Sequence, residues 1–129
     1  MPEHFTVVET DKAPKPIGPY TQAVVVDGVL YTSGQIALKP GDGTLCSDQL
    51  SAQIEHVFDN LAAVLSAAGI GFAHVFKLNI YLTDINDFGE VNAAMEERFS
   101  PPYPARATVQ VARLPKDARL EIDLMATCR

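Results

Sequence analysis

The sequence predicts an α+β fold in which two long amphipathic helices cover one face of a mixed or antiparallel sheet. Apolar and polar residues alternate over several short segments, which is typical of half-buried strands. Two longer segments repeat their apolar residues every three or four positions, which is typical of helices. Turn-forming residues separate these segments, and their order along the chain is β-β-β-α-β-α-β-β.

The first strands are expected near the N-terminus. Residues 5–8 are predicted to form a short strand, and residues 13–19 a stiff loop, because their three prolines fix φ and remove backbone donors. Such a loop can hold Tyr20 in place. Two apolar strands at 23–26 and 29–36 flank an Asp-Gly dipeptide, which is a strong signal for a two-residue hairpin turn.

The first helix is predicted from Leu50 to Ala68. Ser47 or Asp48 is expected to cap its N-terminus, and Gly69 is expected to end it. The wide apolar face of this helix consists of Leu50, Ile54, Val57, Phe58, Leu61, Val64, Leu65 and Ala68.

A strand and the second helix follow. One side of the predicted strand 76–82 consists of Phe76, Leu78, Ile80 and Leu82. Asp84 is expected to cap the helix, and the Ser-Pro-Pro sequence at 100–102 to end it. The apolar stripe of the helix consists of Ile85, Phe88, Val91, Met95 and Phe99. Asn92 lies beside this stripe and needs a hydrogen-bond partner, either in a neighbouring loop or in a functional site.

Two strands are predicted in the C-terminal segment. Along the first, Arg106, Thr108 and Gln110 alternate with apolar residues and therefore share a face. After a Leu-Pro-Lys-Asp turn, a second strand with apolar residues from Leu120 to Ala126 is expected to fold back on the first, bringing Glu121 near Arg106 and Thr108. The register stays open, because a shift of one residue would send the Glu121 carboxylate to the other face.

Arg106 has two interpretations at this stage. It can form a surface or structural ion pair, as many arginines do. Alternatively, its guanidinium can bind a ligand carboxylate through two parallel hydrogen bonds.

Size and charge narrow the classes of function. A chain of 129 residues suits one domain, which we expect to span residues 1–129. The net charge of −6 opposes binding to nucleic-acid phosphates. The apolar runs are shorter than the ~20 residues that span a bilayer, and the N-terminus lacks a signal pattern. We therefore expect a cytoplasmic protein with neither a nucleic-acid nor a membrane partner.

The few cysteine and histidine residues do not suggest a metal site. Cys46 and Cys128 have no Cys-x-x-Cys spacing, and both are expected to be reduced thiols. His4, His56 and His74 fall on three different predicted elements, which argues against a metal site and against a histidine-based triad.

The second face of the sheet also carries alternating apolar residues. A monomer would expose this face, and large exposed apolar patches usually mark interfaces. The sequence therefore predicts a homo-oligomer.

Several motifs, in order, resemble those of the RidA (YjgF) family of reactive-intermediate deaminases. The similarity covers roughly residues 5 to 127, and the motifs are Ile17-Gly18-Pro19-Tyr20-Thr21-Gln22-Ala23, Tyr31-Thr32-Ser33-Gly34-Gln35-Ile36, Asp87-Phe88-Gly89-Glu90-Val91-Asn92, and Pro104-Ala105-Arg106 with the following Val-Ala-Arg-Leu-Pro-Lys and Leu-Glu-Ile. The resemblance implies a chorismate-mutase-like fold, a homotrimer and three sites in the clefts between subunits. It also implies hydrolysis of enamines and imines of short 2-oxo acids without a metal or an organic cofactor.

The resemblance also implies roles for three residues of the C-terminal strands. Arg106 matches the arginine that binds the substrate carboxylate, and Glu121 matches the acidic residue thought to orient the attacking water. Thr108 stands where many deaminases of the family carry cysteine. A thiolate nucleophile is therefore absent, although a hydroxyl can still hydrogen-bond a ligand.

Four further positions are implied to surround the ligand. Tyr20 and Ser33 correspond to polar positions of the site, and Tyr20 is equally well explained as an interface aromatic. Gly34 corresponds to a point where the backbone approaches the ligand and a side chain would block it. Asn92 is expected to line or support the site.

These observations predict a 2-iminobutanoate/2-iminopropanoate-type deaminase whose partner is a small imino or oxo acid. The main alternative is a non-catalytic protein that uses the Arg106 pocket to sense a 2-oxo acid or a related carboxylate. RNA cleavage or inhibition of translation, described for some relatives, agrees poorly with the acidic composition.

Overall fold

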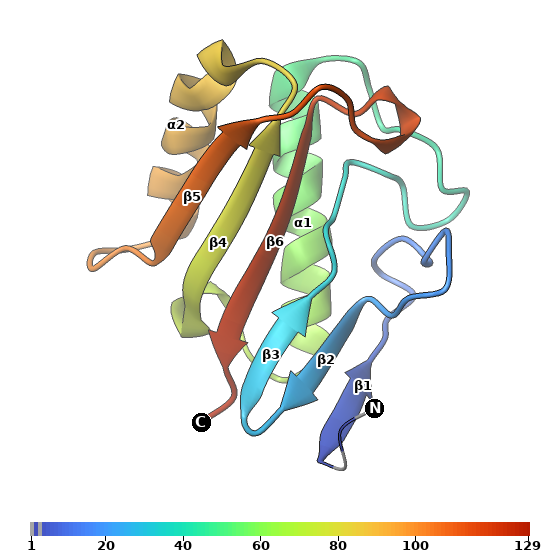
Figure 1. Cartoon of the computed structure of the whole chain (residues 1–129), viewed down its shortest axis with the longest axis vertical. Coiled ribbons are helices and arrows are strands. Elements are labelled where there is room, and N and C mark those ends of the chain that lie inside the picture. The colour runs from blue at the N-terminus through green and yellow to red at the C-terminus, as the bar shows by residue number, and fades with distance from the viewer. Residues whose placement is uncertain (1, 3) are drawn as a thin grey trace.

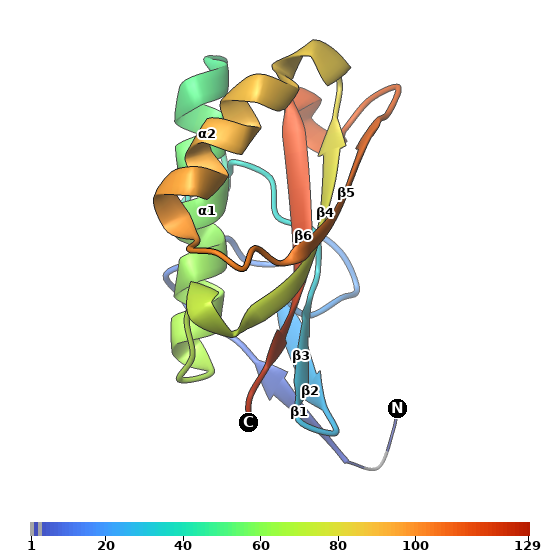
Figure 2. The same ribbon diagram turned by 90° about the vertical axis from the view of Figure 1, so that its left-hand side faces the viewer.

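The computed structural model describes residue 2 and residues 4–129, and it shows a six-stranded mixed sheet in the order β1-β2-β3-β6-β4-β5 (Figure 1). The strands are β1 (Phe5–Val8), β2 (Ala23–Val26), β3 (Val29–Thr32), β4 (Val75–Leu82), β5 (Ala105–Gln110) and β6 (Leu120–Thr127). The α-helices α1 (Leu50–Ala67) and α2 (Phe88–Arg98) lie on the same side of the sheet (Figure 2). The predicted α+β class, with both helices on one face, is therefore confirmed. We call this the helix-covered face and the other the open face.

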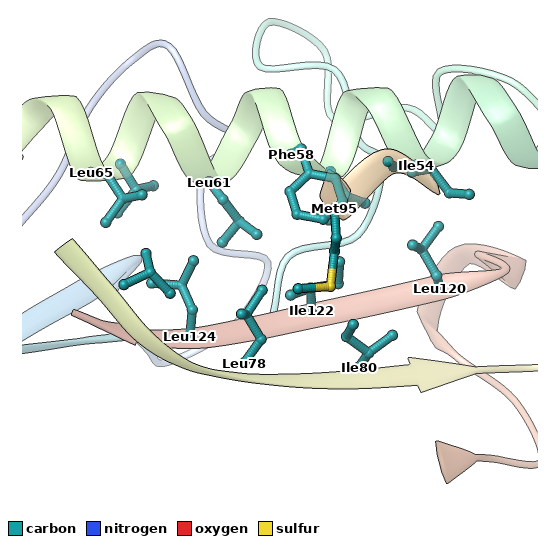
Figure 3. Close-up of a cluster of buried hydrophobic side chains, with 14 of the residues drawn as sticks. Ile54, Phe58, Leu61, Leu65, Leu78, Ile80, Met95, Leu120, Ile122 and Leu124 are labelled. Atoms are coloured by element: carbon teal, nitrogen blue, oxygen red, sulfur yellow. The ribbon is translucent and has the colours of Figure 1, made fainter. Parts of the chain in front are cut away.

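The core lies between α1 and the central strands β4 and β6. Leu120, Ile122 and Leu124 of β6 point at α1 together with Leu78 and Ile80 of β4, and all of them are at most 1% exposed (Figure 3). Burying each such side chain contributes about 1.5–3 kcal/mol to folding. The strict alternation along β6 therefore explains why this strand occupies the middle of the sheet.

The expected hairpin of the two C-terminal strands is wrong. β6 pairs antiparallel with β3 and β4, while β5 pairs only with β4, in parallel. The helix α2 connects β4 to β5, as parallel neighbours require a crossover. Residues of β5 such as Val109 are exposed, which suits an edge strand. Along β6, buried and half-buried residues alternate, which suits a central strand.

The helix boundaries agree closely with the predictions, but one cap does not. Gly69 follows α1 with a φ of +76°, as expected for the residue that ends a helix. The N-cap of α1 is Gln49, without a side-chain cap, so the expected capping by Ser47 or Asp48 is wrong. Gln53 of the helix ties the preceding segment to the first turn, because its Nε2 donates to the Ser47 carbonyl at 2.9 Å.

The start of the second helix and the first residues of β4 also differ from the predictions. Asp84 caps the 3₁₀ turn Ile85–Asp87, which leads directly into α2, by accepting from the Asn86 amide at 2.9 Å. A bulge between Val75 and Lys77 shifts the register of β4. Phe76 is therefore 45% exposed instead of facing the core, as the alternation had predicted.

A second bulge interrupts the strand predicted at 29–36. β3 ends at Thr32, and pairing with β6 resumes only at Gln35, opposite Ile122. Tyr31 lies opposite Met125, and Gln35 lies opposite Ile122. The chain therefore advances four residues from Tyr31 to Gln35 while β6 advances three, so one residue is extra and forms the bulge. Bulges of this kind often re-aim side chains beside functional sites.

Three buried amides tie the loops to this framework. Gln22 donates to the Pro14 carbonyl at 2.9 Å and so anchors the proline-rich loop. Gln53 accepts from the Arg119 amide at 2.8 Å. Asn60 of α1 donates to the carbonyls of Ile36 and Leu38 at 3.2 and 3.1 Å, just after the second bulge.

We expect Asn60→Ala to lower the free energy of unfolding by about 2 kcal/mol, because the Leu38 carbonyl loses the Asn60 donor and the Ile36 carbonyl keeps only the Leu38 amide. Asn86→Ala is the matched control, since Asn86 is exposed. Urea denaturation of both variants measures the difference. Equal stabilities would contradict the anchoring role of Asn60.

Candidate functional site

The residues singled out from the sequence fall into two groups on opposite faces of the sheet. Arg106 and Thr108 lie opposite Leu78 and Ile80, whose side chains face the helices. Glu121 lies opposite Tyr81, one residue out of phase with that buried row. Because side chains alternate along a strand, Arg106 belongs to the helix-covered face and Glu121 to the open face.

The open-face group surrounds a cavity of about 340 Å³ beside Glu121. Three further predicted residues, Tyr20, Ser33 and Gly34, lie in this group with Glu121. The cavity is lined by Ile17, Tyr20, Ser33, Gly34, Pro115 and Glu121. The Ser33 hydroxyl donates to the Thr21 carbonyl at 2.5 Å, and the Tyr20 hydroxyl accepts from the Ile17 amide at 3.3 Å. The Ser33 bond ties the bulge to the segment that follows the proline-rich loop, and the Tyr20 bond folds the tyrosine back onto that loop.

Gly34 is the point of closest approach in this group. A Cβ added at residue 34 would lie 2.5 Å from Oε2 and 2.6 Å from Cδ of Glu121. Side chains do not tolerate such distances, so only glycine leaves room for the carboxylate in this orientation. The glycine was expected to make room for a ligand, and within the chain it makes room for Glu121.

Glu121 is half-buried on β6. Burial raises the pKa of its carboxyl above the ordinary value, and the negative charge of Asp123 raises the pKa further. A raised pKa makes the carboxyl group a better proton acceptor than an ordinary glutamate, which suits acid–base chemistry.

The helix-covered group is centred on the half-buried Arg106 of β5. Its Nη1 donates to Oδ1 of Asn92 at 2.6 Å and lies 3.4 Å from the sulfur of Met95. Its Cζ lies 4.8 Å from the ring centre of Phe88, within the range of a cation–π interaction. All three partners come from α2, so the helix holds the guanidinium in one orientation.

A cavity of about 270 Å³ adjoins this arginine, and its lining consists of Asn92, Met95, Glu96, Tyr103, Pro104 and Arg106. Asn92 therefore supports the arginine and lines the cavity. Phe88 and Met95 were predicted to lie on the apolar stripe of the helix, and their contact with Arg106 was not predicted. The available signal was the spacing of Phe88 and Asn92, which are one helical turn apart.

Arg106 forms no structural ion pair within the part of the chain that the structure describes. The salt bridges found among residues 2 and 4–129 involve Arg98, Arg113 and Arg119. Only Nη1 of Arg106 is used in the hydrogen bonds described above. The rest of its donor fork is suited to a planar anion such as a carboxylate.

Thr108 follows Arg106 on the same face of β5. Its hydroxyl oxygen is buried and has no hydrogen-bond partner among the described residues. An unpaired buried hydroxyl is costly, so this position marks a place where a further donor or acceptor would be stabilising.

The expectation that Glu121 comes near Arg106 within the chain is wrong. Strand β4 lies between β5 and β6, and the two side chains leave the sheet on opposite faces. One chain therefore cannot present both groups to the same small ligand.

No metal site or membrane-spanning helix is found among the described residues. Within residues 2 and 4–129, no three His, Cys, Asp or Glu side chains are grouped to hold a metal ion. In the same part of the chain, no helix has the length and apolarity needed to cross a membrane.

We expect Gly34→Ala to displace the Glu121 carboxylate while the chain stays folded, because the clash involves the end of a flexible side chain. Gly41→Ala is the matched control, since a Cβ at residue 41 meets no atom within 4 Å. Crystal structures of both variants measure the position of Glu121. An unmoved carboxylate in Gly34→Ala would show that the predicted clash does not occur.

We also expect Glu121→Gln to stabilise the protein at neutral pH. A raised pKa in the folded state means that ionised Glu121 opposes folding above that pKa. This penalty disappears as the pH falls through the folded pKa towards the ordinary value of 4.5. Melting temperatures from pH 4 to pH 8 measure the effect, with the exposed Glu97→Gln as control. A gain that grows as the pH falls would contradict this sign.

The chain is similar to characterised and solved proteins over nearly its whole length. Residues 10–128 match the family model described as Endoribonuclease L-PSP. A human 2-iminobutanoate/2-iminopropanoate deaminase is 45% identical over 120 residues, covering 93% of this chain and 88% of that protein. A Rid-family protein from Yersinia pestis is 40% identical with a TM-score of 0.92, covering 96% of this chain and 99% of that chain.

The Escherichia coli protein TdcF, solved with bound serine, is 38% identical with a TM-score of 0.85, covering 95% of this chain and 98% of that chain. The similarity to these proteins covers 93–96% of this chain and includes both groups of residues described above. The chain belongs to the Rid (YjgF, endoribonuclease L-PSP) family.

Proposed function

We propose that this protein hydrolyses 2-iminobutanoate, 2-iminopropanoate and their enamine forms to the 2-oxo acid and ammonia. The observation that carries the proposal is Arg106, which is held by Asn92 and Phe88 at a cavity and has no carboxylate partner among the described residues. The 45% identity to the human deaminase supports the same reaction.

Arg106 serves as the anchor for the substrate carboxylate in this proposal. Its unused donors can form two parallel hydrogen bonds to a carboxylate, which fixes both position and orientation. Fixing the substrate lowers the entropic part of the barrier, because the imine carbon is then held where water can attack it. Thr108, on the same strand face, offers its unpaired hydroxyl to a ligand or water that enters beside Arg106.

Glu121 serves as the acid–base group. Its carboxylate accepts a proton from water while the water oxygen bonds to the imine carbon, and the imine nitrogen takes up a proton. The proton on the imine nitrogen comes from solvent, and a tetrahedral carbinolamine results. Protonated Glu121 then gives its proton to the amine nitrogen while the carbinolamine hydroxyl loses its proton to solvent, so the C–N bond breaks as the C=O bond forms, and ammonia and the 2-oxo acid are released. The raised pKa of Glu121 suits this exchange, since the group must gain and lose a proton in one cycle.

The separation of Arg106 and Glu121 supports a site shared between copies of the chain. We propose a homotrimer in which Arg106 of one subunit and Glu121 of the next face a common cleft. The open face is suited to contact, because it exposes Val7, Tyr31 and Val109 by 40–47%. Tyr20, Ser33 and Gly34 then line the Glu121 side of the cleft, and Asn92 lines the Arg106 side.

The same separation favours a second candidate function. A single subunit holds the carboxylate anchor and the acid–base group on opposite faces of the sheet, so it would bind 2-oxo acids at Arg106 without converting imines. RNA cleavage is less well supported, because a net charge of −6 opposes binding to phosphates.

The main test follows the decay of 2-iminobutanoate, generated by a threonine dehydratase and trapped by semicarbazide. We expect the protein to accelerate the decay, and Arg106→Ala to lower kcat/KM by about 100-fold or more, because charged hydrogen bonds are lost. Arg106→Lys should recover only part of the rate, since an ammonium cannot form the two parallel bonds. Retained 2-oxobutanoate binding without imine turnover would favour the binding function.

Subunit complementation tests the shared site. We expect Arg106→Ala and Glu121→Ala proteins to be inactive separately. When the two variant proteins are denatured and refolded together, about a quarter of the sites in a random head-to-tail ring should contain both intact residues. Recovery of roughly that share of activity is the expected result. A mixture as inactive as its components, with mixed oligomers shown by mass spectrometry, would contradict the shared site.

A further inference from the structure

A hydrogen-bonded network lies beside Glu121 on the open face. Asp123 of β6 accepts from Nδ2 of Asn79 at 2.8 Å through Oδ1, and from the Tyr81 hydroxyl at 3.1 Å through Oδ2. Both donors come from β4, so the Asp123 side chain is held from the neighbouring strand through both of its oxygens.

The strand register places this network directly against Glu121. Glu121 and Asp123 are two residues apart on β6 and therefore share a face. Glu121 lies opposite Tyr81, and Asp123 lies opposite Asn79. The Tyr81 side chain thus starts opposite Glu121 on the neighbouring strand and reaches the Asp123 carboxylate.

We propose that Asp123, held by Asn79 and Tyr81, is a positioning residue that keeps a fixed negative charge beside Glu121 and so sets the proton affinity of that group. This inference rests on the proposed acid–base role of Glu121. The sequence did not predict a functional role for Asn79, Tyr81 or Asp123.

Among the described side chains around Glu121, Asp123 is the one that carries a negative charge. The ionisable side chains on the open face of the elements packed around Glu121 are Tyr81 and Lys77 from β4, Tyr31 from β3, Asp123 from β6, and Lys15 and Tyr20 from the proline-rich loop. Lys77 and Tyr31 lie opposite Met125, four residues along β6 from Glu121. Ser33 and Gly34 at the bulge, and Pro115 before β6, contribute no charge. Among the described residues, no lysine or arginine forms a salt bridge with Asp123.

The protonation of the network agrees with this arrangement. Burial raises the pKa of the Tyr81 hydroxyl, and the charge of Asp123 and its hydrogen bond raise the pKa further. Tyr81 therefore remains a donor to Asp123 over the range in which Glu121 titrates. The fixed carboxylate favours the protonated form of Glu121, which is the form that can give a proton to a departing ammonia.

The test is a titration of the Glu121 side-chain carboxyl by carbon-13 NMR, in the assembled protein and its variants. We expect Asp123→Asn to lower the pKa of Glu121, and Tyr81→Phe to lower it less, because Asp123 then loses one of two anchors. Glu97→Gln is the control, since Glu97 is exposed on α2, across the sheet from Glu121. It should leave the titration unchanged.

Activity provides a second readout. The acid limb of the pH profile of kcat/KM should move to lower pH in Asp123→Asn, by the same amount as the NMR titration. An unchanged Glu121 titration in both Asp123→Asn and Tyr81→Phe would overturn the proposal. If Asp123→Asn does not fold, Tyr81→Phe and Asn79→Ala decide the question, because they leave the carboxylate in the chain. The titration does not depend on turnover, so an inactive parent protein would contradict only the proposed function.

Discussion

The alternation of side chains across the central strands determines how this protein can use its polar residues. Strand β4 pairs with β5 on one side and with β6 on the other. The register then places Arg106 in phase with the buried leucines and Glu121 out of phase with them. Because this parity also builds the core, no small rearrangement of β6 can move Glu121 to the other face without exposing Leu120, Ile122 and Leu124. A site that needs both groups therefore needs two copies of the chain.

The framework around each group limits its motion. On the helix-covered face, α2 supplies an amide, a thioether and an aromatic ring to one guanidinium. On the open face, a bulge brings the glycine backbone against Glu121, and Asn60 fixes the chain just beyond that bulge. Groups held in this way lose less entropy when a ligand binds, which is the basis of preorganised sites.

Local patterns predicted much of this arrangement, but not the strand pairing. The shared face of Arg106, Thr108 and Gln110 followed from alternation alone, and so did the buried row of β6. The hairpin of the two C-terminal strands was wrong because periodicity defines which residues share a face and not which strand lies alongside. The bulges at Phe76 and Gly34 were missed for a related reason. An extra residue in one strand becomes visible only against its partner, and the contact between Phe88 and Arg106 likewise depends on how α2 lies over β5.

A crystal structure of the assembled protein with 2-oxobutanoate tests the account most directly. We predict that the ligand carboxylate binds the unused donors of Arg106, and that Glu121 of a neighbouring copy faces the 2-oxo carbon across the cleft. A ligand bound at Arg106 with no Glu121 from any copy beside it would contradict the shared site and leave a protein that binds 2-oxo acids only.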